Sequence, residues 1–311
     1  MKTMERDKGL NAIAINRLRC ILATTVCIGI CVMVFFAFVY HLLTDPNNLI
    51  QEVGWQSFHL FTILSNMIMG VVSGMCIPFA VDGLRYHNYH LPRWFVNLLF
   101  MATCGVTITF VIAVTVLSSA VGFYRVMIYR HNIIIHTICP VLSILLFIFL
   151  NSDHTIKFKS SLIAILPLMA YAFLYTIMVF LIGEDAGGWR DHYQIYRISE
   201  YLPIPVLLLI LFFIGLLVAN MLRLAHNAVH KRRKAALERY YQQADTFSYD
   251  NIQSAIQALA GIDRKRDMGG ELTVPRRILT MMEKKYRSGL SVQDMCKLYI
   301  DEYYGTEEEN G

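Results

Sequence analysis

The fold is decided by residues 201–223, which read YLPIPVLLLILFFIGLLVANMLR. No charged side chain interrupts this stretch before Arg223, and about 20 apolar residues suffice to cross the hydrocarbon core of a bilayer. The composition of the whole chain agrees, because 56% of its residues are hydrophobic and only 16% are charged, whereas soluble domains carry about 25% charged residues. We therefore predict an integral membrane protein.

Five further stretches are long and apolar enough to span. The predicted spans are 20–43, 56–80, 94–118, 132–151, 160–183 and 201–223. Almost all charged residues lie in the gaps between these spans. The sequence thus predicts an all-α, polytopic membrane protein. Six transmembrane helices occupy residues 20–228, after an N-terminal arm (1–19) and before a small helical C-terminal subdomain (229–311).

The distribution of Lys and Arg predicts the orientation, because short basic loops stay in the cytoplasm. With six spans, most basic residues fall on the side that holds both termini: Lys2, Arg6, Lys8, Arg17, Arg19, Arg85, Arg93, Lys157, Lys159, Arg223, Lys231, Arg232, Arg233 and Lys234. Arg125 and Arg130, in the third loop, depart from this bias. We expect both termini in the cytoplasm and the protein in the plasma (inner) membrane.

The tail from about residue 229 mixes basic and acidic residues on helix-like stretches near 229–245, 249–261, 275–287 and 291–304. The last two stretches flank Gly289, Leu290 and Ser291 and give the outline of a helix–turn–helix. Its basic charge is matched by many acids, so we do not expect nucleic acid as a partner. The run 231–234 is instead predicted to contact anionic lipid headgroups, as juxtamembrane basic clusters do.

No cysteine lies in a predicted outer loop. Six of them, Cys20, Cys27, Cys31, Cys76, Cys104 and Cys139, lie in or beside the spans, where the side chain behaves as a small apolar group. Neither a disulfide framework nor a structural zinc site is indicated. We expect no metal and no cofactor.

Two spans carry polar stripes near the same predicted end. Residues three and four apart share a helix face. One stripe comprises His59, Thr62, Ser65 and Asn66, and the other comprises Asn132, His136 and Ser143. At a rise of 1.5 Å per residue, Thr62 lies about 10 Å and His136 about 8 Å below the outer boundary. The two side chains are therefore predicted at one depth.

A hydroxyl and an imidazole at one depth suit nucleophilic acyl transfer. Threonine needs an adjacent base to attack at neutral pH, and histidine is the usual base. We predict Thr62 as nucleophile and His136 as base, with Asn66 and Ser65 near the developing oxyanion, Asn132 orienting the imidazole and His59 elsewhere in the pocket. Against this stands a structural interpretation, because Ser, Thr and Asn often form hydrogen bonds between membrane helices as packing contacts.

The stretches 57–66 (SFHLFTILSN) and 136–140 (HTICP) resemble the androgen-induced-gene family of intramembrane threonine hydrolases and its bacterial six-helix relatives. That family hydrolyses fatty acid esters of hydroxy fatty acids with a Thr and a His on separate helices, and has both termini in the cytoplasm. The resemblance implies Thr62 as nucleophile, His136 as base and a role in lipid metabolism. It does not extend to the tail from about residue 230.

Two other functions stay open. A transporter or channel also places polar residues inside a helical bundle, and the four prolines Pro140, Pro167, Pro203 and Pro205 would mark broken helices. A haem protein would use His41, His59, His131 and His136, although no span offers two stacked ligands. The aromatic residues Trp55, Tyr124, Trp189, Tyr193, Tyr196 and Tyr201 rim the predicted outer face, where an interfacial belt is their simplest interpretation.

Overall fold

The computed structural model describes residues 2–43, 54–86, 91–129, 132–151, 154–193 and 195–242, and every regular element in these ranges is helical. Five helical stretches in these ranges are long and apolar enough to cross a membrane: Leu18–Tyr40, Phe61–Val81, Arg93–Leu117, Phe158–Ile182 and Ile204–Arg233. They correspond to five of the six predicted spans. The sixth, 132–151, contains a shorter apolar helical stretch, Ile134–Leu150. The all-α, polytopic class is confirmed.

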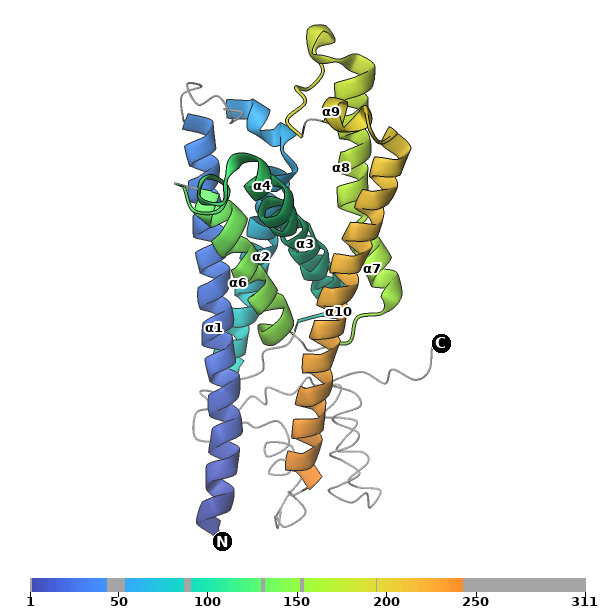
Figure 1. Ribbon diagram of the computed structural model, residues 1–311. Coiled ribbons are helices and arrows are strands. Elements are labelled where there is room, and N and C mark those ends of the chain that lie inside the picture. Colours follow the sequence, from blue (N-terminus) through green and yellow to red (C-terminus); the bar gives the residue numbers. More distant parts are fainter. Residues whose placement is uncertain are drawn as a thin grey trace.

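The helices that make up the spans lie side by side in one bundle (Figure 1). They are α1 (Lys2–Leu43), α2 (Phe61–Tyr86), α3 (Arg93–Ile112), α6 (Cys139–Leu145), α7 (Phe158–Ala164), α8 (Leu166–Thr176) and α10 (Ile204–Gln242). The central helix is α3, which packs against α2, α6, α7 and α10. Its side chains Phe95, Leu99 and Phe100 are fully buried in the main hydrophobic core.

The bundle has two ends, which we name from Figure 1. The terminal end, at the bottom of the figure, holds the start of α1 and the end of α10. The loop end, at the top, holds the 3-10 turn η1 (Gly54–His59) and the short helix α9 (Ile195–Ser199). Both ends of the described chain therefore lie at one end of the bundle.

Helices α1 and α2 approach closely because two glycines on α2 face α1. A Cβ added to Gly70 would lie 2.9 Å from Cγ1 of Val34, and one added to Gly74 would lie 3.5 Å from Sγ of Cys31. The Cys31 thiol donates to the Gly70 carbonyl oxygen at 3.1 Å. Glycines four residues apart allow this approach in membrane helices.

Several described segments are π-helical: η2 (Ala113–Leu117), η3 (Ile134–Ile138), η4 (Leu146–Leu150) and η5 (Ile177–Ile182). Each one inserts an extra residue into an otherwise α-helical run, which rotates the faces before and after it. The predicted stripe of Asn132, His136 and Ser143 assumed a regular α-helix. The extra residue in η3 interrupts that periodicity between His136 and Ser143.

The last span differs from the prediction at both ends. Helix α10 begins at Ile204, directly after Pro203, and Pro205 occupies its first turn, where the missing N–H costs nothing. The helix then continues without a break to Gln242. The predicted boundary between membrane domain and tail, at residues 228 and 229, falls inside this helix. The predicted tail helices beyond residue 242 lie outside the described residues.

Candidate functional site

Thr62 is the second residue of α2, at the loop end of the bundle. The predicted span started near residue 56, but residues 54–59 form the separate turn η1 and α2 begins only at Phe61. Thr62 therefore lies in the first turn of its span, nearer to the end of the bundle than predicted. Its side chain is half-buried.

His136 lies in the π-helical turn η3, and Pro140 gives the physical reason for that turn. Proline has no N–H to donate and its ring clashes with the carbonyl four residues before it. A π turn removes the clash by shifting the hydrogen bonds, so that the N–H of Cys139 donates to the carbonyl of Ile134. In this register Pro140 stands where the donor to the Ile135 carbonyl would be, and that carbonyl needs another partner.

Asn66 supplies the missing donor from α2. Its Nδ2 lies 3.2 Å from the carbonyl oxygen of Ile135 and 2.8 Å from that of Thr62. The side chain is 2% exposed, so the hydrogen bond to Ile135 is shielded from water. This amide connects the backbone of the predicted nucleophile with the residue next to the predicted base.

Apolar contacts also hold the start of α2 against η3. Ile63 of α2, Ile135 of η3 and Ala37 of α1 form a small buried cluster. On the other side of η3, the Thr137 hydroxyl donates to the carbonyl of Met127 at 2.9 Å. The turn that carries His136 is thus held from two sides, and it lies against the turn that carries Thr62.

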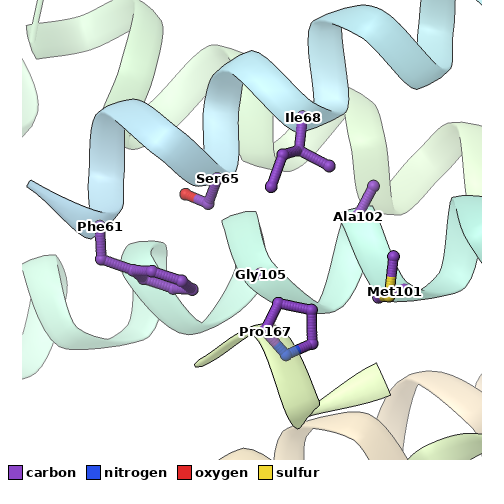
Figure 2. Close-up of a pocket in the computed structure, with 7 residues that line it drawn as sticks. All are labelled: Phe61, Ser65, Ile68, Met101, Ala102, Gly105 and Pro167. Carbon is purple, nitrogen blue, oxygen red and sulfur yellow. The ribbon is translucent and has the colours of Figure 1, made fainter. Parts of the chain in front are cut away.

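Ser65 belongs to a different face of α2. Its hydroxyl donates to the Thr62 carbonyl at 3.1 Å, and its side chain lines a cavity of about 20 Å³ between α2, α3 and α8. Figure 2 shows the cavity lining: Phe61, Ser65, Ile68, Met101, Ala102, Gly105 and Pro167. This volume holds about one water molecule. The cavity is apolar except for Ser65, and neither Thr62 nor His136 lines it.

Asn132 and His59 point to other partners. Asn132 donates from Nδ2 to the carbonyl of Arg125 at 2.8 Å and so closes the loop that follows α5 (Phe123–Met127). The ring of His59 stacks on Trp189, with centroids 4.6 Å apart and planes at 16°. The orienting role of Asn132 and the place of His59 elsewhere in the pocket stay predictions.

An aromatic cluster that the sequence did not predict covers the start of α2. It consists of Tyr171 and Tyr175 on α8 and of Trp189 and Tyr193 in the following loop. The hydroxyl of Tyr171 donates to the His59 carbonyl at 2.6 Å, and the hydroxyl of Tyr193 accepts the N–H of Phe61 at 3.1 Å. Trp189 and Tyr193 are half-buried in this cluster, and the interfacial belt stays a prediction for them.

Within this cluster, burial affects the ionisation of the Tyr193 hydroxyl. Loss of hydration raises the pKa of Tyr193 above its ordinary value, while hydrogen bonds with Tyr171 and with the Phe61 N–H act in the opposite direction. Burial disfavours the phenolate because a charged oxygen loses more hydration than a neutral one. Tyr193 therefore stays a neutral hydroxyl next to the first turn of α2.

Asn66 provides a stability test of the contact between α2 and η3. We expect Asn66→Ala to lower the stability of the folded protein by about 1 kcal/mol, because the buried Ile135 carbonyl loses its donor. The measurement is the thermal unfolding midpoint of the purified protein. Ser73→Ala is the matched control, since the Ser73 hydroxyl is buried on the same helix and has no hydrogen-bond partner among the described residues. Equal midpoints for the Asn66 variant and the wild type would refute the contact.

No known protein family, curated protein sequence or solved structure matches this chain.

Proposed function

We propose that this chain is an intramembrane hydrolase of lipid-like esters, with Thr62 as nucleophile and His136 as base. The observation that carries the proposal is the Asn66 amide, which joins the Thr62 carbonyl to the Ile135 carbonyl at 2.8 and 3.2 Å. The turn that carries Thr62 and the turn that carries His136 thus lie next to each other. This supports the proposal, because acyl transfer needs a hydroxyl and an imidazole in one site. The resemblance of both motifs to fatty acid ester hydrolases points to the same chemistry.

The reaction has two steps. The Thr62 hydroxyl attacks the ester carbonyl while His136 takes its proton, and the proton then passes to the leaving alcohol as the carbon–oxygen bond breaks. Water next attacks the acyl-threonine while His136 takes one of its protons. The bond between the acyl carbon and the Thr62 oxygen then breaks, His136 returns the proton to that oxygen, and the fatty acid leaves. The half-buried positions of both side chains suit a substrate that enters from the bilayer near the loop end.

The negative charge that develops on the carbonyl oxygen needs a hydrogen-bond donor. Both protons of the Asn66 amide already serve two carbonyls, so Asn66 would have to release one of them to act as predicted. The backbone N–H of Thr62 has no acceptor among the described residues, as is usual in the first turn of a helix. We assign it as oxyanion donor and Asn66 as the residue that fixes the spacing of the two turns.

The five apolar spans place the protein in a membrane. We propose that it is a plasma (inner) membrane, with the terminal end in the cytoplasm and the site in the outer leaflet. Lys231 and Arg232 are exposed at the terminal end of α10, where anionic headgroups would stabilise them.

Lipid analysis of cells tests the substrate class directly. Membranes that contain the wild-type protein are compared with membranes that contain equal amounts of Thr62→Ala. We expect lipid esters to accumulate, and their free fatty acid products to fall, in the variant. Identical ester pools in the two membranes would contradict the proposal.

A small-molecule transporter is the second candidate, on one specific observation. The fifth predicted span is broken between α7 and α8, at Ile165, and the ring of Pro167 lines the cavity in Figure 2. Broken helices next to cavities are typical of substrate sites in transporters. Solute uptake into proteoliposomes that persists in Thr62→Ala would favour this function over hydrolysis.

A further inference from the structure

Residues 151 and 154–157, the described residues between η4 and α7, form no regular helix, and Asn151, His154 and Ile156 among them are buried. Side chains of other helices form hydrogen bonds with backbone groups in this region. Asn227 of α10 makes two hydrogen bonds to Ile156, accepting its N–H and donating to its carbonyl, both at 2.9 Å. Arg19 of α1 donates to the Leu150 carbonyl at 2.6 Å. His154, within the segment, lies with Nε2 at 2.9 Å from the Leu91 carbonyl before α3.

His226 is the most buried member of this arrangement. It belongs to α10, its side chain is 0% exposed, and its ring stacks on Phe147 at 4.4 Å and 22°. Its Nδ1 lies 3.0 Å from the carbonyl oxygen of Phe147, and its Nε2 lies 2.8 Å from the carbonyl oxygen of His154. Both ring nitrogens therefore face backbone acceptors.

A neutral imidazole cannot satisfy both acceptors. In either tautomer one nitrogen carries a proton and the other carries a lone pair. That lone pair would face a carbonyl oxygen at hydrogen-bond distance in a site without water access, which is unfavourable for both groups. Only the doubly protonated ring donates to Phe147 and His154 at once, and the aromatic face of Phe147 stabilises the resulting cation.

We propose that His226 is a proton-binding latch. Its imidazolium form donates hydrogen bonds to the carbonyls of Phe147 and His154 and so holds η4 and His154 against α10. Loss of one proton removes one of these hydrogen bonds and weakens the contact between α10 and the end of the predicted span 132–151. The charged form makes the additional hydrogen bond only in the folded protein. Its contribution to stability is therefore present at low pH and is lost as the pH rises and the proton leaves.

Other ionisable groups surround the latch. Arg19 reaches the segment from α1, His154 lies within it, and His230 is buried one turn further along α10. Arg223 of α10 lies over the ring of Phe158, 5.7 Å from its centroid. Helices α3 and α7 also pack against α10. Their charged side chains Arg93 and Lys159 are exposed.

The test is the thermal unfolding midpoint of the full-length protein in lipid nanodiscs, from about pH 6 to about pH 9, a window that covers histidine titration. We expect the midpoint of the wild type to fall as the pH rises. In His226→Gln, which cannot titrate at this position, we expect that fall to be lost. His230→Gln is the matched control and keeps the fall. A fall that persists in His226→Gln, or that His230→Gln removes to the same extent, overturns the proposal.

Nitrogen NMR of histidine-labelled wild-type protein gives a second readout that does not require a folded variant at position 226. We expect one imidazole to show two protonated ring nitrogens at neutral pH. Phe147→Leu assigns this signal, because removal of the stacked ring shifts it. Detection of an unprotonated nitrogen on the imidazole that Phe147→Leu shifts would overturn the proposal.

Discussion

We expect Thr62→Ala to abolish covalent labelling of the protein by a fluorophosphonate probe, which reacts with activated hydroxyls of hydrolases. Alanine removes the oxygen that would attack phosphorus, so no adduct can form at this position. We expect His136→Ala to slow labelling about 100-fold or more, because the hydroxyl loses its general base. Both rates are measured on purified protein in detergent by fluorescence of the labelled band.

Two controls make this result specific. Thr62→Ser keeps a hydroxyl at the same position and should retain labelling, whereas a purely structural role of the threonine would not predict such rescue. Ser73→Ala removes a buried hydroxyl further along the same helix and should label like the wild type. Unchanged thermal unfolding midpoints show that the variants are folded. Full labelling of both Thr62→Ala and His136→Ala would reject the dyad.

The second large effect is expected from Gly188→Ala. The loop that carries Trp189 is held by backbone hydrogen bonds, from the N–H of Gly188 to the Gly183 carbonyl at 2.8 Å and from the N–H of Trp189 to the Met178 carbonyl at 3.2 Å. A Cβ on residue 188 would collide with both of these carbonyl oxygens. Because backbone atoms cannot move aside as a side chain can, we expect a loss of about 3 kcal/mol or more in folding stability.

The same substitution should move Trp189 away from His59, since the two rings now stack at 4.6 Å. The measurements are the thermal unfolding midpoint and the tryptophan fluorescence of the purified protein. Gly187→Asn is the control in the same loop, because Gly187 is left-handed, with φ of 88°, and nothing lies within 4 Å of an added Cβ. Asparagine tolerates this conformation. Equal stability of Gly188→Ala and Gly187→Asn would contradict the collision.

Much of the fold follows from the sequence because hydrophobicity is a local property. An apolar run such as 201–223 needs no partner to be recognised as a span, and five of the six predicted spans coincide with helices of sufficient length. The helix boundaries were less accurate. Pro203 delays the start of α10, and the separate turn η1 delays the start of α2.

The polar residues of the candidate site can be identified from the sequence for a similar reason. Polar residues on apolar helices identify the stripes, and the contact of Asn66 with Ile135 lies between the two predicted helices. The π turn at His136 was missed, although Pro140 is a visible signal for it. Residues three to seven apart share one face only in a regular α-helix, and a single inserted residue changes the face on which the later residues lie.

Two arrangements could not be predicted from one sequence. The aromatic cluster joins His59 to Tyr171, and the latch joins Phe147 to His226. Each pair joins helices that are far apart in the sequence. The spacing of residues within one helix does not predict which distant helix packs against it. A signal did exist for close packing of α2, since Gly70 and Gly74 have the four-residue spacing of tightly packed membrane helices.

The most direct measurement is the position of the covalent adduct itself. The wild-type protein is treated with a fluorophosphonate, digested, and analysed by tandem mass spectrometry of the peptide that contains the start of α2. We expect the phosphonyl group on the oxygen of Thr62, and we expect it to be absent from this peptide in His136→Ala at short reaction times. An adduct on any other residue of the folded protein, with Thr62 unmodified, would contradict the central role of this threonine.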